Sequence, residues 1–106
     1  MKPVVHSAAA ESDIRYATEY YRHEAGPEVA TAFIDFLEQA THQACAWPGA
    51  GSPQIAETLG IPGLRSLALA QFPYAIFYVD HPTHVDVWRV LHVGRDIPAT
   101  LRTSLP

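Results

Sequence analysis

The sequence predicts an α+β fold in which a helical hairpin packs on one face of a small, mostly antiparallel sheet, in the order β-α-α-β-β-β. Residues 7–47 carry apolar side chains at helical spacing, whereas residues 65–92 change to an alternation with a period of two. The length of 106 residues fits one domain, and 48% of the residues are hydrophobic, which is enough to build a core. We therefore expect a single domain that spans residues 1–106.

The chain begins with a short apolar run over residues 1–6, which predicts an edge strand. Ser7 is suited to cap the helix that follows, because its hydroxyl can accept a hydrogen bond from a free backbone N–H. Gly26 can end this helix, and Pro27 is tolerated at the start of the next one. Between Ser7 and Gly26, apolar residues recur at steps of four, three and four and share one helical face: Ala10, Ile14, Ala17 and Tyr21.

A second helix gives a stronger signal, because its apolar residues recur at regular steps of three and four. These residues are Ala30, Phe33, Leu37, Ala40, Ala44 and Trp47. Pro48 and Gly49 end the series. Two amphipathic helices with a Gly-Pro turn between them predict an antiparallel helical hairpin over residues 7–47.

Residues 48–64 are rich in glycine and proline, and they predict a long loop with one helical turn near residues 55–59. Three antiparallel strands follow over residues 65–92, with a bend at Phe72-Pro73. The tail, residues 93–106, has room for one further helical turn. In the last strand, a period of two would place Val85, Val87, Arg89 and Leu91 on one face, and Asp86, Trp88, Val90 and His92 on the other.

The net charge of −4 argues against a general nucleic-acid-binding protein, which needs a basic surface. Three basic residues stand against eight acidic ones in residues 1–64, whereas residues 65–106 hold four arginines and three aspartates. A site for an anion is therefore expected in the second part. Cys45 is the only cysteine, so no internal disulfide can form, and with no secretory signal or long apolar run we expect a cytoplasmic protein without a membrane span.

The arginines and histidines of the second part are the candidate functional residues, and each has a structural alternative. Arg89 can pair with an acidic group of a helix or partner, or it can contact an anion. His92 can bond a backbone group, with Arg95 paired to Asp96 or holding the tail, or the two can handle a phosphate together. Arg65 can hold the long loop or contact a target.

Other residues are weaker candidates. His81 and His84 offer only two ligands where zinc normally needs three or four, so we expect no metal and no cofactor. Cys45 lies beside the apolar series of the second helix, and burial explains it. The aromatic residues are more numerous than one small sheet face needs, so some are candidates for an exposed interface: Tyr16, Tyr20, Tyr21, Trp47 and Trp88.

Several short segments, taken in order, resemble one protein family from about residue 14 to residue 98. They are Tyr20-Tyr21, Gly26-Pro27-Glu28-Val29-Ala30 with Phe33, Pro48-Gly49-Ala50-Gly51-Ser52-Pro53, Pro62-Gly63-Leu64-Arg65, Phe72-Pro73-Tyr74-Ala75-Ile76-Phe77-Tyr78, Val87-Trp88-Arg89-Val90-Leu91-His92 and Arg95-Asp96. The ordered set is similar to the RelE/ParE superfamily of bacterial toxin–antitoxin pairs. The closing Arg-Val-Leu-His-x-x-Arg-Asp pattern resembles the ParE branch.

The resemblance implies a small α+β sandwich, a ParD-like antitoxin as partner, and inhibition of DNA gyrase by binding, without a catalytic residue of the chain's own. It also implies a role in growth arrest and plasmid stabilisation. On this hypothesis the target or antitoxin contacts come from Arg65, Trp88, Arg89, His92, Arg95 and Arg102. Direct sequence-specific binding of nucleic acid is not expected.

Two alternatives stay open. A RelE-like, ribosome-dependent endoribonuclease would use His92 with Arg89 and Arg95, because metal-free RNA cleavage needs an acid or base and cations at the phosphate. The chain departs from that pattern, since its only lysine is Lys2 and Phe72-Pro73 stands where nuclease members place an arginine. The other alternative is a non-toxic relative that only binds its antitoxin.

Overall fold

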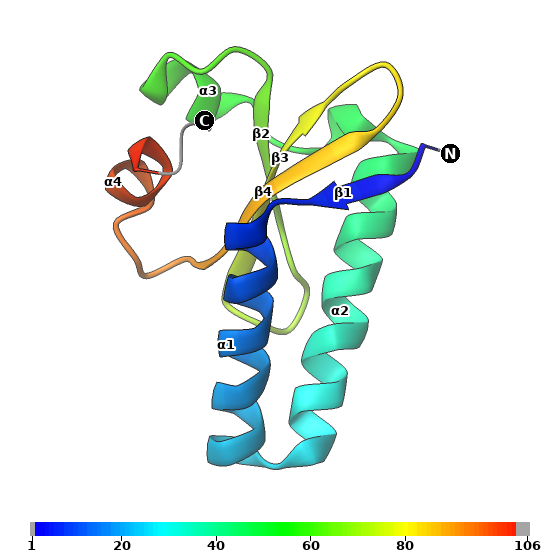
Figure 1. Cartoon of the computed structure of the whole chain (residues 1–106), viewed down its shortest axis with the longest axis vertical. Coiled ribbons are helices and arrows are strands. Elements are labelled where there is room, and N and C mark those ends of the chain that lie inside the picture. Colours follow the sequence, from blue (N-terminus) through cyan, green and yellow to red (C-terminus); the bar gives the residue numbers. More distant parts are fainter. Residues whose placement is uncertain (1, 104–106) are drawn as a thin grey trace.

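The computed structural model describes residues 2–103, and it confirms the predicted α+β fold. Its sheet has the order β1-β4-β3-β2, with β1 parallel to β4 and the other pairs antiparallel (Figure 1). The elements are β1 (Val4–His6), α1 (Ala8–Ala25), α2 (Pro27–Ala46), the 3-10 helix η1 (Pro48–Ala50), α3 (Gln54–Leu59), β2 (Leu64–Ala68), β3 (Tyr74–Asp80), β4 (Val85–His92) and α4 (Ile97–Arg102).

The helical hairpin forms as predicted, with its two long helices side by side (Figure 1). The Ser7 hydroxyl accepts a hydrogen bond from the backbone N–H of Ala10 at 3.0 Å and so caps α1. Gly26 joins the helices at a φ of 97°, a conformation that a side chain would strain, and Pro27 begins α2.

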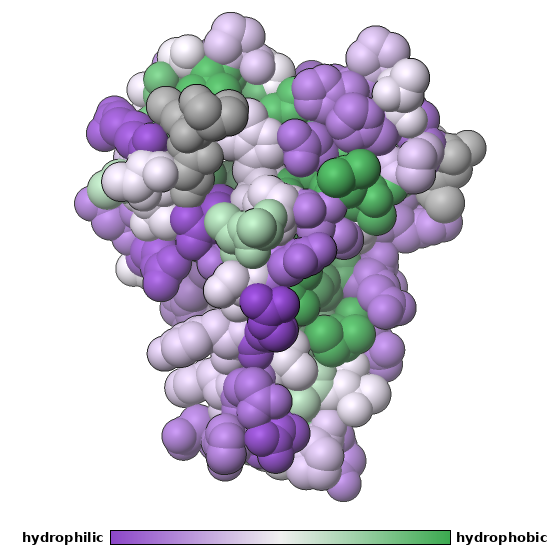
Figure 2. Space-filling model, in the orientation of Figure 1, coloured by the Kyte–Doolittle hydropathy of each residue, from purple (hydrophilic) through white to green (hydrophobic). Residues whose placement is uncertain are grey.

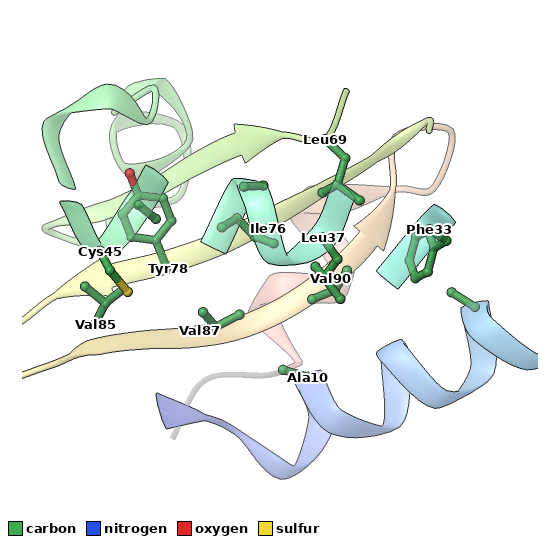
Figure 3. Packing of buried hydrophobic residues seen from close by; sticks show 13 residues of the cluster. Ala10, Phe33, Leu37, Cys45, Leu69, Ile76, Tyr78, Val85, Val87 and Val90 are labelled. Carbon is green, nitrogen blue, oxygen red and sulfur yellow. The ribbon is translucent and has the colours of Figure 1, made fainter. Parts of the chain in front are cut away.

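The main core lies between the hairpin and the facing side of the sheet (Figure 3). Ala10 and Ala17 of α1 are buried there, and Ile14 and Tyr21 pack against it. From α2 the first five members of the predicted apolar series are buried: Ala30, Phe33, Leu37, Ala40 and Ala44. The helical period therefore predicted the core-facing stripe of both helices.

Trp47, the sixth member of that series, is an exception. The helix ends at Ala46, and Trp47 follows it with φ −136° and ψ 79°, which takes its side chain off the helical stripe. Its side chain is 68% exposed. The expectation that Trp47 continues the apolar face is wrong, because a periodic pattern is valid only while the backbone remains helical.

A second, smaller core lies on the opposite sheet face. Its buried residues are Leu64, Ala75, Phe77, Leu91 and Leu101. Two six-residue helices, α3 and α4, cover it and lie next to each other (Figure 1). The helical turn predicted near residues 55–59 is confirmed by α3. The loop predicted over residues 48–64 also contains η1, which was not predicted, and its last residue, Leu64, already belongs to β2.

The predicted faces of β4 are wrong in its second half. Phe77 pairs with Arg89 but Tyr78 pairs with Val87, so Trp88 is an extra residue in the strand, a β-bulge. The bulge shifts the alternation by one, so that Val90 joins the main core and Leu91 joins the second core, the reverse of the expectation. The apolar pattern of the sequence gives no sign of where this bulge lies.

Tyr78 of β3 holds the start of the segment that joins α2 to β2. Its buried hydroxyl donates to the carbonyl oxygen of Pro48 at 2.6 Å and accepts from the N–H of Gly51 at 3.0 Å. A Cβ at residue 51 would lie 2.3 Å from that hydroxyl, so this close approach requires glycine. Arg65 donates to the Gly51 carbonyl at 2.8 Å, which confirms that this arginine holds the loop.

Candidate functional site

A groove of about 670 Å³ runs between α1 and the C-terminal half of β4. We call it the tyrosine–arginine groove, after the side chains argued below. Its helical wall consists of Ser12, Asp13, Tyr16, Ala17, Tyr20 and Tyr21, and its sheet wall consists of Pro73, Tyr74, Arg89, Val90, Leu91, His92 and Arg95. The groove therefore brings together three of the six predicted contact residues: Arg89, His92 and Arg95.

Asp13 neutralises Arg89 within this groove. The Arg89 guanidinium donates to both carboxylate oxygens of Asp13, at 2.7 and 2.8 Å, and the two side chains are only 14% and 11% exposed. The pKa of Arg89 is raised, chiefly by this hydrogen bond, against the opposing effect of burial. Of the two roles considered for Arg89, pairing with an acidic group of a helix is confirmed.

The same carboxylate closes part of a strand edge. β1 pairs with β4 only as far as Val87, and beyond it the backbone of β4 faces α1. The N–H of Val90 donates to Asp13 at 3.0 Å, and the carbonyl of Trp88 accepts from the Ser7 hydroxyl at 2.6 Å. The carbonyl of His92 accepts from the N–H of Arg95 at 3.1 Å. The chain's own groups thus occupy part of the edge that β1 leaves open.

His92 and Arg95 lie at the end of the groove and differ in their bonding. The Nδ1 atom of His92 accepts from the N–H of Gly94 at 2.9 Å, so the neutral ring carries its proton on Nε2. The ring also packs edge-on against Tyr74. Within residues 2–103, no carboxylate lies within ion-pair distance of Arg95.

The expected Arg95–Asp96 pair does not form. The Asp96 carboxylate instead accepts from the N–H of Ala99 at 3.2 Å and caps α4. The expectation that His92 bonds a backbone group is confirmed. Arg95 thus carries a positive charge that the groove does not compensate.

Tyrosines form the helical side of the groove. Tyr16 and Tyr20 are 76% and 51% exposed, whereas Tyr21 packs against Phe72 and Tyr74. Burial raises the pKa of Tyr21 and of Tyr74, so both remain neutral phenols at ordinary pH. The prediction that some of the surplus aromatic residues are exposed is confirmed for Tyr16 and Tyr20, as well as for Trp47.

The other predicted contact residues lie outside the groove. Arg65 holds the loop through Gly51, and Trp88 packs against the second core. Arg102 lies in the last turn of α4. On another part of the surface, apolar side chains gather over β1 and along the crease between α1 and α2 (Figure 2), and Val5 of β1 is 49% exposed.

Sequence reasoning missed the role of Asp13. Asp13 lies near the start of α1, where a carboxylate is favoured by the helix dipole and gives no sign of a distant partner. Its partner Arg89 is 76 residues further along the chain, and no local pattern joins the two. The only sequence signal was general: an arginine between apolar neighbours on a strand needs an acidic partner.

A family model described as "ParE toxin of type II toxin-antitoxin system, parDE" matches residues 4–97. The chain belongs to the ParE toxin family. The predicted membership of the ParE branch is thereby confirmed.

The solved structures agree with this ParE fold. One described as "Chromosomal ParDE TA system from P. aeruginosa" superposes with a TM-score of 0.70 at 21% identity, over 87% of this chain and 96% of the other. No curated protein matches the sequence. Within the described residues, this ParE-family chain has no helix long and apolar enough to cross a membrane, and no group of three or more side chains suited to hold a metal ion.

Proposed function

We propose that this ParE-family chain is a toxin that inhibits DNA gyrase by binding it, and that a ParD-like antitoxin neutralises it. The mechanism is tighter binding to one gyrase state, such as the complex with cleaved DNA, than to the others. The uncompensated Arg95 beside exposed tyrosines is the observation that carries the proposal, because it offers a contact surface without a reaction centre. Gyrase as the target also places the toxin in the cytoplasm.

The chemistry of the groove argues against the endoribonuclease alternative. A metal-free nuclease needs several free cations at the phosphate, yet the charge of Arg89 is compensated by Asp13. A general base needs a free lone pair, yet the Nδ1 lone pair of His92 is engaged with Gly94. Arg95 is then the only arginine of the predicted catalytic set that is available to a substrate.

The decisive experiment is a supercoiling assay with gyrase from the native host and purified chain, scored also for linear DNA after protein removal. We expect loss of supercoiling with accumulation of linear DNA. Arg95→Glu should abolish both effects, because it reverses the free charge of the groove. Arg15→Glu is the matched control, since Arg15 is exposed on α1, does not line the groove and is not one of the predicted contact residues.

Other results would redirect the assignment. Normal supercoiling, with a folded chain and native gyrase, would contradict gyrase inhibition. Cleavage of messenger RNA on ribosomes that His92→Ala abolishes would establish the nuclease instead. Harmless overexpression without an antitoxin would establish a non-toxic relative.

A further inference from the structure

The sequence of β4 is compatible with two registers against β3. Without the bulge at Trp88, regular alternation would place Arg89 and Leu91 on the face of the main core and Val90 on the face of the second core. With the bulge, Val90 joins the main core and Leu91 joins the second core. Because residues 90 and 91 are both apolar, each register buries an apolar side chain on both faces of the sheet. The apolar pattern therefore does not choose between the two registers.

Hydrogen bonds from the start of α1 distinguish the bulged register from the regular one. Successive residues of a regular strand point their N–H and C=O groups to opposite edges. Ser7 nevertheless binds two consecutive carbonyls of β4, since its N–H donates to Val87 at 3.0 Å and its hydroxyl donates to Trp88 at 2.6 Å. Both carbonyls face the same edge because Trp88 is the extra residue of the bulge.

Asp13 makes a second distinction one step further along the strand. Its carboxylate accepts from the N–H of Val90 at 3.0 Å, at the edge that β1 leaves open beyond Val87. In the regular register that N–H would point to β3 and could not reach Asp13. The carboxylate also accepts two hydrogen bonds from Arg89, at 2.7 and 2.8 Å, which hold the guanidinium outside the main core.

We propose that Asp13 is a positioning residue that selects the bulged register of β4 and thereby sets where the side chains at the end of the strand lie. Its bond to the strand backbone exists in only one register, and only such a differential contact can shift an equilibrium between two states. The selected register pairs His92 with Tyr74 and determines where Arg95 enters the groove. The inference stands on the fold and does not depend on the proposed function.

The charge of Arg89 offers a competing explanation. A guanidinium is unstable inside an apolar core, so Arg89 by itself could exclude the regular register. The two explanations differ once residue 89 is apolar. If Asp13 selects the register, Arg89→Met keeps the bulge, because the carboxylate still binds the N–H of Val90. If the charge alone selects it, the same variant adopts the regular register.

The first test compares cross-strand NOEs, measured by NMR, in the wild-type chain and two variants. In the bulged register Val90 lies opposite Ile76 with its N–H turned away from β3, which brings the two Hα atoms close together. We expect this Hα contact in the wild-type chain and in Arg89→Met. In Asp13→Ala/Arg89→Met, residue 89 should contact Ile76 instead. The loss of one charge-assisted hydrogen bond corresponds to about a tenfold change in population.

Ser12→Ala/Arg89→Met is the matched control, because Ser12 is the exposed neighbour of Asp13 on α1 and its loss leaves the carboxylate in place. This variant should keep the contact between Val90 and Ile76. The proposal is overturned if Arg89→Met alone loses that contact. It is equally overturned if a folded Asp13→Ala/Arg89→Met chain retains it.

A second contact reports on the candidate site itself. The rings of His92 and Tyr74 pack edge-on, with their centroids 5.2 Å apart. The regular register would place His92 opposite Pro73, so the NOEs between the two rings should disappear in Asp13→Ala/Arg89→Met and persist in the control. A merely stabilising role of Asp13 would lower the free energy of unfolding without exchanging these contacts.

The wild-type chain decides the question should the double variant not fold, as judged by circular dichroism. A hydrogen bond transmits a scalar coupling from the donor nitrogen to the carbon that carries the acceptor oxygen. The Val90 amide nitrogen should therefore couple to the side-chain carboxyl carbon of Asp13, and absence of this coupling in the folded chain would overturn the proposal. None of these measurements contains gyrase, so a chain that shows the bulged register without inhibiting gyrase would overturn only the proposed function.

Discussion

The two faces of the sheet are built in different ways. One face is covered by α1 and α2, which are 18 and 20 residues long and contribute regular apolar stripes. The other is covered by α3 and α4, which are six residues each and come from the predicted loop and the tail. Isolated helices of six residues are not stable in water, because nucleation costs more than so few hydrogen bonds return. The stability of α3 and α4 therefore depends on packing against the second core, whereas α1 and α2 have regular apolar stripes that can be recognised in the sequence.

The largest effect is expected from removing the central ring of the main core. Phe33 is fully buried and packs against Tyr21, Phe72 and Tyr74. Phe33→Ala should lower the free energy of unfolding by about 3–5 kcal/mol, because it removes buried apolar area and leaves a cavity. Urea denaturation followed by circular dichroism measures this. A loss below about 1 kcal/mol would show that the main core does not dominate stability.

The matching change on the other face is Leu101→Ala, which removes the fully buried anchor of α4. We expect a loss of about 2–3 kcal/mol, smaller than for Phe33→Ala because a short terminal helix can move to fill the space. Hydrogen exchange should become faster in α3 and α4 while α1 and α2 keep their protection. Equal acceleration in all four helices would mean that the two faces unfold as one unit.

At the margin of the main core, Asp13→Ala should cost about 2 kcal/mol, because it removes the carboxylate that accepts from a partly buried guanidinium and from the Val90 N–H. The double variant Asp13→Ala/Arg89→Met should recover part of that loss, since the methionine side chain does not need the carboxylate that the first change removes. Denaturation of the two variants side by side decides the point. An additive loss in the double variant would argue against a direct energetic coupling.

Tyr78→Phe tests the hydroxyl that holds the segment between α2 and β2, and it should also change how the free energy of unfolding depends on pH. The loss of two hydrogen bonds should cost about 1–2 kcal/mol near neutral pH. Burial raises the pKa of the Tyr78 phenol above its usual 10.0, so the folded state holds this proton more tightly than the unfolded state does. The wild-type chain should therefore lose stability as the pH rises beyond 10, and the variant should lose less over that interval. Parallel alkaline denaturation curves would contradict this.

The smallest effect on stability is expected at Arg95. Because its guanidinium has no acidic partner in the described part of the chain, Arg95→Gln should change the free energy of unfolding by less than about 0.5 kcal/mol. The same variant should lose gyrase inhibition if the groove is the contact surface. A stability change like that of Asp13→Ala would show that Arg95 serves the fold instead.

The sequence by itself determined the element order, the hairpin with its Ser7 cap and Gly26-Pro27 turn, and most of the buried stripe. These features are local, since a helical period or a cap depends on residues within one or two turns. The family resemblance likewise rested on short ordered motifs. It placed Arg89, His92 and Arg95 near one another because they follow in one strand and its end.

Only the tertiary structure decided the rest. The bulge at Trp88 exchanged the faces of Val90 and Leu91, because strand alternation depends on a register set by the neighbouring strand. The pairing of Asp13 with Arg89 joins residues that are 76 positions apart. The sequence predicted a helical turn at each of the two six-residue helices, but what stabilises them is the apolar surface of the second sheet face, which no local pattern shows. Each of these features depends on contacts between segments that are far apart in the chain, and a local pattern in the sequence does not show which distant segments meet.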